Sequence, residues 1–191
     1  NVLSDRPVVE PYTKPGTTLY SLDLIPRTTL AQAMDVLSSV ASISGYQAVL
    51  LAAERSLATV PMITSAGGTL RPARFLIMGA GVAGLQAIAT SRRLGAIVRA
   101  YDVRSASRTE VESLGATFIG VDGAAEDKKA GGYAVEQSTE HLERIRQVIH
   151  QEAVHADVII TTAKIPGRKA PLLITEDMVR SMKPGAVVVD L

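Results

Sequence analysis

The sequence contains no cysteine and no tryptophan, and neither sign of charge is in excess. Without cysteine the chain can form no disulfide, use no thiol nucleophile and offer no thiolate to a metal. Its 20 basic and 19 acidic residues nearly balance, so nothing in the charge favours nucleic acid or anionic lipid as a partner. No uninterrupted apolar run approaches the ~18 residues that a membrane span needs. The longest run, Ala48 to Ala53, is expected to lie in the core.

Metal ligands and a catalytic triad are also missing from the pattern. The three histidines, His141, His150 and His155, show no metal-ligand spacing. No serine, histidine and aspartate are arranged as a nucleophile with its base. We therefore expect no metal, and any chemistry is expected to depend on a bound organic cofactor.

What the chain does have is enough apolar sequence for a sizeable core. Its 191 residues, 47% of them hydrophobic, suit one domain with a piece of another. Because it lacks an initiator methionine and stops directly after an apolar run, we expect it to be a fragment of a longer protein. The predicted division is a remnant of a flanking domain at 1–26, a connecting helix region at 27–60, and a truncated dinucleotide-binding domain at 61–191.

Strand and helix patterns alternate from residue 74 to the end of the chain. Strands are expected at 74–78, 96–101, 117–121, 157–162 and 186–190, with helices at 82–94, 107–114, 138–151 and 176–182. Short apolar strands alternating with helices indicate parallel βαβ units with helices on both faces. The predicted fold class is α/β, a doubly wound, mostly parallel Rossmann-type sheet with a partial flanking domain at the N-terminus.

The first third of the chain carries weaker patterns. A short strand is expected at 18–22 and a helix at about 29–56. Leu30, Met34, Leu37 and Ala41 have helical spacing, Thr29 and Gln32 form a capping-box pattern, and Gly45 is expected to mark a bend.

A glycine-rich turn follows the strand at 74–78 and opens the helix at 82–94. It reads Gly79-Ala80-Gly81-Val82-Ala-Gly84. In this setting Gly79 permits a tight turn, Gly81 lets the backbone approach a pyrophosphate, and Gly84 lets helix and strand pack closely. Amides at the helix start would then meet the phosphate charge. The alternative is a glycine turn that only packs.

An acidic residue, Asp102, comes 18 residues after Gly84 at the end of the next strand, where Val103 and Arg104 follow it. A carboxylate there can accept hydrogen bonds from both ribose hydroxyls and would repel a 2′-phosphate, which favours NAD over NADP. Arg104 points the other way, because an arginine at this place could tolerate that phosphate.

Several motifs together resemble the NAD(H)-binding component of proton-translocating nicotinamide nucleotide transhydrogenase, and alanine dehydrogenase is a related family. The motifs are Gly79 to Thr90, Arg93 to Ala96, Tyr101 to Arg104, Ala130 to Tyr133, Ile159 to Ala163, Ile165 to Arg168, Ala170-Pro171 and Met182 to Gly185. The resemblance covers about residues 25–191. It implies NAD(H) on this chain and NADP(H) on a partner domain.

The stretch from Pro26 to Asp35 distinguishes the two families. The resemblance implies that Arg27, Gln32 and Asp35 lie beside the nicotinamide as its positioning residues. Gln32 and Asp35 are three apart and share one helix face, so both could point at one ligand. The alternative is that Gln32 closes the capping box with Thr29 and Asp35 is a solvated first-turn acid.

Two further segments are candidates for cofactor contact. The segment from Asp122 to Gln137 is long and charged, which suggests a lid, and the resemblance implies that its Tyr133, next to Gly132, folds over the nucleotide. Ala163 and Lys164 come at the carboxyl end of the strand at 157–162, where ligands bind in open α/β sheets. A surface loop and a structural turn are the alternatives.

The resemblance implies hydride transfer between NAD(H) and NADP(H), coupled by the whole complex to proton translocation. It implies an NADP(H)-binding domain and a membrane domain as partners, a homodimer, and a place at the membrane surface on the bacterial cytoplasmic or mitochondrial matrix side. An alanine dehydrogenase, which acts on pyruvate and ammonia, and a non-enzymatic NAD-sensing module are the alternative functions.

Overall fold

In the computed structural model the described residues are 6–26, 28–121, 139–163, 170 and 172–191. The elements of the N-terminal region are α1 (Arg6–Val9), η1 (Glu10–Tyr12), η2 (Leu22–Leu24), η3 (Thr29–Met34), α2 (Val36–Arg55), β1 (Ile63–Ser65) and β2 (Gly68–Leu70). Those of the sheet domain are β3 (Arg74–Met78), α3 (Val82–Arg93), β4 (Ile97–Tyr101), α4 (Ser107–Ser113), β5 (Thr117–Ile119), α5 (Thr139–His155), β6 (Val158–Thr161), α6 (Glu176–Ser181) and β7 (Val187–Asp190).

The main sheet has five strands in the order β5-β4-β3-β6-β7, and every pairing in it is parallel. The chain starts in the middle at β3 and runs outward to β5. It then returns through α5 to β6 on the other side of β3. This reversal of direction creates a switch point between β3 and β6, where open α/β sheets bind their ligands.

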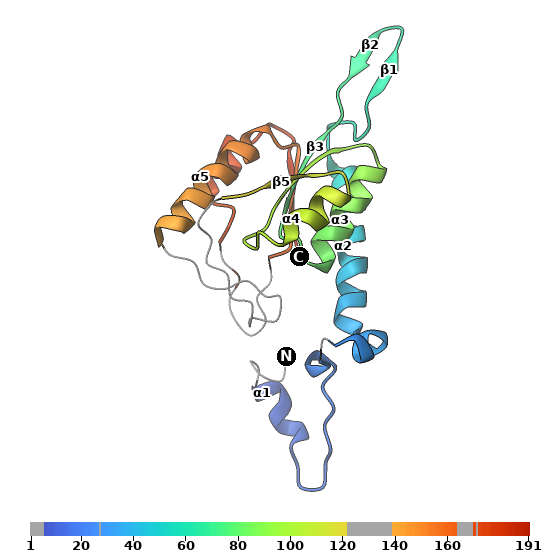
Figure 1. Cartoon of the computed structure of the whole chain (residues 1–191), viewed down its shortest axis with the longest axis vertical. Helices are drawn as coiled ribbons and strands as arrows, with labels where there is room; N and C mark the ends of the chain where they lie inside the picture. Colours follow the sequence, from blue (N-terminus) through green and yellow to red (C-terminus); the bar gives the residue numbers. More distant parts are fainter. Residues whose placement is uncertain (1–5, 27, 122–138, 164–169, 171) are drawn as a thin grey trace.

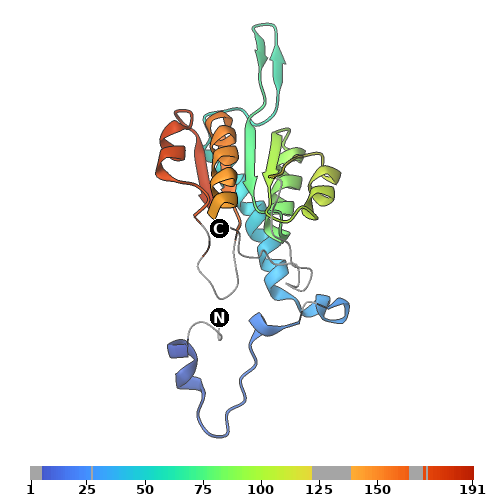
Figure 2. The same ribbon diagram turned by 60° about the vertical axis from the view of Figure 1, so that its left-hand side comes forward.

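Helices cover both faces of this sheet, and each face has its own apolar core (Figure 1). Phe75 and Ile77 of β3 pack with α2, α3 and α4, whereas Leu76 and Met78 of the same strand pack with α5 and α6. Figure 2 brings α5 in front of the sheet. All four of these β3 side chains are buried, as expected for a strand covered on both faces.

The predicted fold class is therefore confirmed, and each strand and helix expected from residue 74 onward is present. The boundaries differ by a residue or two, except that α5 extends to His155. The strand expected at 18–22 is wrong, because 18–21 form no regular element and η2 begins at Leu22. The antiparallel β1–β2 hairpin was not predicted; its residues are exposed and extend away from the sheet (Figure 1). The three-part division of the chain stays a prediction.

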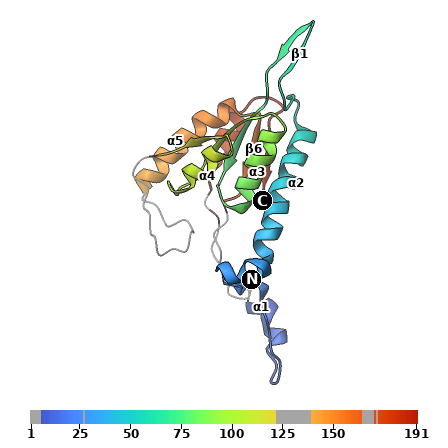
Figure 3. The ribbon, with the colours of Figure 1, turned by 45° about the vertical axis from the view of Figure 1, so that its right-hand side comes forward.

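Helix α2 runs beside α3 along one side of the domain (Figure 3). It is continuous through Gly45, so the expected bend is wrong. Gly45 is buried, and a Cβ there would lie 2.1 Å from the Ala83 carbonyl oxygen. The glycine thus lets the two helix backbones approach each other.

The start of this helix also differs from the prediction. Thr29 to Met34 form a separate 3-10 turn, and Asp35 caps α2 by accepting a hydrogen bond from the Ser38 amide at 3.0 Å. The capping box of Thr29 and Gln32 is therefore wrong. The buried face of α2 consists of Gly45, Ala48, Val49 and Ala52. Leu30, Met34 and Leu37 are exposed because they precede the stretch of the helix that reaches α3.

By length and composition α2 could cross a membrane, with a mean hydropathy of 1.5, and no other described helix could. The search for an uninterrupted apolar run did not find it, because serines and Gly45 divide the segment. Core helices of soluble domains share this length and composition. In the structure, Ala48, Val49 and Ala52 of α2 are buried in the core beside α3 and β6.

Gly45→Ala is expected to lower the free energy of unfolding by about 1–3 kcal/mol, because the added methyl group would force α2 away from α3. In an open helix the same change would be stabilising by roughly 1 kcal/mol. Denaturant unfolding measures the difference, with Gln47→Ala on the exposed side of α2 as the control. A stabilised Gly45→Ala variant would contradict the close contact.

Candidate functional site

The switch point brings together the turn after β3 and the end of β6. The Thr162 amide donates to the Met78 carbonyl at 2.8 Å, and the Thr162 hydroxyl donates to the Gly79 carbonyl at 3.1 Å. From the other side, the Gly79 amide donates to the Tyr101 carbonyl at 2.7 Å. Three strands thus hold the glycine turn at the carboxyl edge of the sheet.

The three glycines of the turn have the separate roles that the sequence predicts, as far as the protein's own atoms can test them. Gly79 has φ +102°, a conformation that other residues rarely adopt. A Cβ on Gly84 would lie 1.8 Å from the Gly79 carbonyl oxygen, so only glycine lets α3 start this close to the strand. At Gly81 an added Cβ would meet no atom within 4 Å. The space over Gly81 is open, as a bound pyrophosphate would require.

The start of α3 offers amides to that space. Its first bond to the capping residue runs from the Leu85 amide to the Gly81 carbonyl at 2.8 Å. The amides before Leu85 have no acceptor inside the helix, and Gly81 has no side chain to cap them. Val82 is partly exposed at the same place. Such a helix start attracts a negatively charged group.

Asp102 lies next to this turn and is tied to it. Its carboxylate accepts hydrogen bonds from the Ala80 amide at 2.7 Å and from the Arg104 amide at 2.8 Å. The Arg104 guanidinium donates two more, from Nε at 2.9 Å and from Nη2 at 3.0 Å. Val103, between the two, is half-buried.

Charges at this position are set by the same contacts. Hydrogen bonding to Asp102 raises the pKa of Arg104 above its usual value, so the guanidinium stays charged. Burial, together with the charge of Asp102, raises the pKa of the Tyr101 hydroxyl above its usual range. Tyr101 is therefore neutral beside an ionised Asp102–Arg104 pair.

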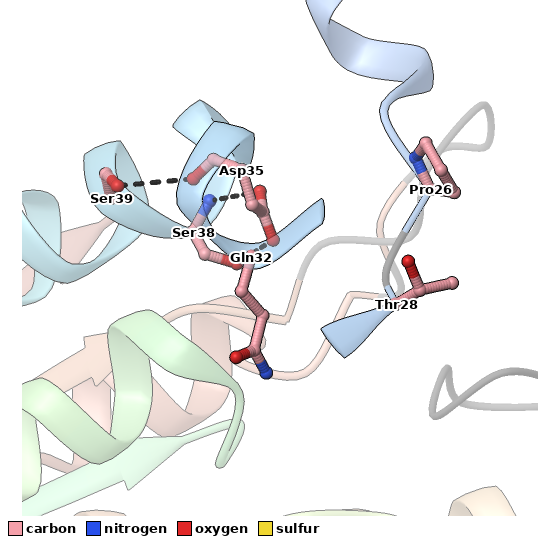
Figure 4. Close-up of a pocket in the computed structure, with 6 residues that line it drawn as sticks. All are labelled: Pro26, Thr28, Gln32, Asp35, Ser38 and Ser39. Carbon is pink, nitrogen blue, oxygen red and sulfur yellow. Dashed lines mark hydrogen bonds between the residues drawn. The ribbon is translucent and has the colours of Figure 1, made fainter. Parts of the chain in front are cut away.

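A second feature is a cavity of about 330 Å³ at the start of α2, lined by Pro26, Thr28, Gln32, Asp35, Ser38 and Ser39 (Figure 4). Gln32 and Asp35 thus lie at one cavity, as their spacing predicts. Asp35 also caps α2, a role that neither sequence interpretation included. Ser38, which donates to Asp35 through its hydroxyl at 2.7 Å, was not predicted, although its place three residues after Asp35 was a usable signal.

The cavity and the glycine turn lie on the same side of the domain, because α2 and α3 run side by side (Figure 3). Gly45 is level with Ala83 at the start of α3. Asp35 comes ten residues earlier, which is roughly 15 Å along a helix axis at about 1.5 Å per residue. The structure therefore separates the two groups of predicted residues along one edge of the domain.

Four predicted residues lie outside the described region of the chain: Arg27, Gly132, Tyr133 and Lys164. The segment predicted as a lid lies outside it as well. Ala163 is described and is half-buried beside the turn; a Cβ on Gly79 would be 3.3 Å from its amide nitrogen. Among the described residues, no group of three or more histidines, aspartates or glutamates could hold a metal ion.

A comparison with protein families matches residues 48–191 to "Alanine dehydrogenase/PNT, C-terminal domain". The chain belongs to this family. The match contains the whole glycine turn and Asp102, and it begins inside α2, so Gln32 and Asp35 precede it.

Within the alanine dehydrogenase/PNT family, the resemblance to transhydrogenases is confirmed. The chain is 51% identical over 191 residues to the first of the polypeptides that make up NAD(P) transhydrogenase subunit alpha in Rhodospirillum rubrum; the alignment covers 99% of this chain and 50% of that relative. A transhydrogenase structure from Sinorhizobium meliloti has a TM-score of 0.85 at 45% identity, covering 98% of this chain and 50% of that one. The chain thus spans about half the length of these relatives.

Alanine dehydrogenase is a more distant relative. The enzyme of Mycolicibacterium smegmatis is 25% identical over 194 aligned residues, which cover all of this chain and 46% of that enzyme. Within the family, this chain is therefore more similar to the transhydrogenase alpha subunits than to that dehydrogenase.

Proposed function

We propose that this chain is the NAD(H)-binding component of a proton-translocating transhydrogenase and that it exchanges hydride with NADP(H) held on a separate domain. The observation that carries the proposal is the connection of the glycine turn to Asp102 through the Ala80 amide. It keeps an acceptor for the ribose beside an open position for the pyrophosphate. The transhydrogenase alpha subunits among the relatives support the same function.

The adenosine half of NAD(H) would be held by the turn and its neighbours. The amides at the start of α3 would meet the pyrophosphate over Gly81, where the structure leaves space. Asp102 would accept from the ribose hydroxyls, and Val103, Val82 and Ala163 would border the nucleotide. Gly132, Tyr133 and Lys164 keep their predicted roles in covering it.

The nicotinamide half would extend toward the start of α2. Gln32 and Asp35 would position the ring from the cavity they share, with Arg27 beside them. The bound nicotinamide supplies the hydride chemistry. The chain's residues orient the ring and keep water away from it, and orientation alone can contribute several kcal/mol to such a reaction, about 7–11 at the upper end.

The partners follow from the same proposal. An NADP(H)-binding domain would present the second nicotinamide, and a membrane domain would carry the protons, so this chain would lie at the cytoplasmic or matrix surface of a membrane. Two copies would form a homodimer. No nucleic acid or metal partner is proposed.

NADH is expected to bind at least about tenfold more tightly than NADPH, a difference of about 1.4 kcal/mol. The reason is the negative charge of Asp102, whose side chain is only 8% exposed and would face a 2′-phosphate at close range. Fluorescence or calorimetric titration of both nucleotides measures the ratio. Equal affinities would contradict the assignment of NAD(H) to this site.

A hydride-transfer assay separates the proposed function from its alternatives. The protein is mixed with NADH and with an NADP-binding domain of a transhydrogenase loaded with an NADP⁺ analogue of distinct absorbance. Reduction of the analogue supports the proposal. Oxidation of NADH by pyruvate and ammonia without that domain would assign the chain to alanine dehydrogenase, and binding of NADH with neither reaction would leave a sensing module.

A further inference from the structure

The Asp102 carboxylate has no acceptor position left for a ligand in this structure. A carboxylate offers about four lone-pair positions to donors. Oδ2 accepts from the Ala80 amide at 2.7 Å and from Arg104 Nη2 at 3.0 Å. Oδ1 accepts from the Arg104 amide at 2.8 Å and from Arg104 Nε at 2.9 Å. Any ribose hydroxyl must therefore replace one of these donors.

The four donors are of two kinds. The Ala80 and Arg104 amides are held by the backbone, Ala80 in the glycine turn and Arg104 in the bend before α4, so neither can leave without unfolding the turn. The two guanidinium nitrogens belong to a side chain that is 30% exposed. A long exposed side chain can rotate away without moving the backbone.

We propose that Arg104 occupies, in the free protein, the two acceptor positions of Asp102 that the two ribose hydroxyls of the nucleotide take, and that Arg104 is thereby a specificity-determining residue of the site. The proposal rests on the NAD(H) site described above. The number of donors matches: two guanidinium nitrogens leave and two hydroxyls arrive, while both amide bonds persist.

The exchange also explains what a positive charge does beside a carboxylate that selects against phosphate. While paired, Arg104 neutralises Asp102 and holds it against the turn, where Nη2 also donates to the Ala80 carbonyl at 3.3 Å. Once displaced, the guanidinium remains close to the ribose. There it disfavours NADPH less than an uncompensated Asp102 would, because a 2′-phosphate could pair with it.

Removing the guanidinium is therefore expected to change the two affinities in opposite directions. In Arg104→Ala, NADH should bind about threefold to tenfold more tightly, because no ion pair must be broken first. NADPH should bind more weakly, since Asp102 then faces its phosphate alone. Arg104→Lys keeps the charge without the two-pronged donor and should fall between wild type and Arg104→Ala for NADH.

Arg108→Ala is the matched control, because it removes the same charge from the neighbouring α4. Arg108 pairs with Glu112 at 3.4 Å, and its side chain is 50% exposed. This variant should bind both nucleotides as wild type does. Thermal unfolding of every variant checks the fold, and Arg104→Lys tests the proposal if Arg104→Ala is unstable.

A second readout follows Arg104 in the wild-type protein. The ¹⁵N resonance of its Nε–H group, assigned by its loss in Arg104→Lys, should shift and exchange faster with water when NADH saturates the site. An unchanged resonance in the NADH complex, or NADH affinity that is unchanged or weaker in Arg104→Ala, would overturn the exchange while the NAD(H) site stands. If neither wild type nor any variant binds NADH, the proposed function fails, and the exchange fails with it.

Discussion

Gly81→Val is expected to weaken NADH binding by at least about a hundredfold, which corresponds to about 2.8 kcal/mol, while the protein folds as before. The isopropyl group would stand in the space over the turn where the pyrophosphate is proposed to lie. It would touch none of the protein's own atoms at its Cβ, because none lies within 4 Å of that position. Calorimetry with NADH and far-UV circular dichroism measure the two effects.

Gly84→Ala is the control that makes this prediction specific. Its Cβ would lie 1.8 Å from the Gly79 carbonyl oxygen, so the added methyl group should disturb the turn and lower the stability of the whole domain. The two glycines should therefore separate binding from folding. Normal NADH affinity in a folded Gly81→Val protein would remove the pyrophosphate from this turn.

Asp35→Asn is expected to lower the rate of hydride transfer by about tenfold to a hundredfold and to change NADH affinity by less than about threefold. Asparagine caps a helix about as well as aspartate, so the bond from the Ser38 amide should persist and α2 should keep its start. The change thus removes the charge without the cap. Gln32→Asn, which withdraws the amide from the cavity by one methylene, should act in the same direction.

Transient kinetics with the NADP-binding partner give the transfer rate, and titration gives the affinity. Glu54→Gln is the matched control, because it makes the same acid-to-amide change at the exposed far end of α2. Its transfer rate should equal that of wild type. Unchanged transfer with a large loss of NADH affinity in Asp35→Asn would contradict the positioning role.

Local sequence patterns were sufficient wherever one element follows directly from its neighbours. The apolar run Arg74 to Met78, the glycines after it and the helix from Val82 predicted β3, the turn and α3 almost to the residue. The distance from Gly84 to Asp102 placed the carboxylate at the end of β4, because a helix and a strand of ordinary length fill that interval. These are contacts between residues that are close in sequence.

Predictions failed where a distant contact decided the local structure. Gly45 has the appearance of a helix interruption, yet α3 packs against it and keeps α2 continuous. The capping-box pattern of Thr29 and Gln32 lost to Asp35, whose position allowed the helix to start where α2 reaches its neighbour. Residues 63–70 form a hairpin although their side chains are exposed, and alternation of apolar and polar residues could not reveal it.

The sequence by itself determined the alternation of strands and helices, the glycine turn with its acidic partner, and the family to which these motifs point. Only the tertiary structure decided that Asp102 is bonded to the turn through Ala80, and that the Arg104 guanidinium covers the carboxylate. The physical reason is that hydrogen bonds and close backbone approaches depend on three-dimensional distance. Residue patterns record the periodicity of single elements, whereas packing of one element on another selects the donors that each acceptor meets.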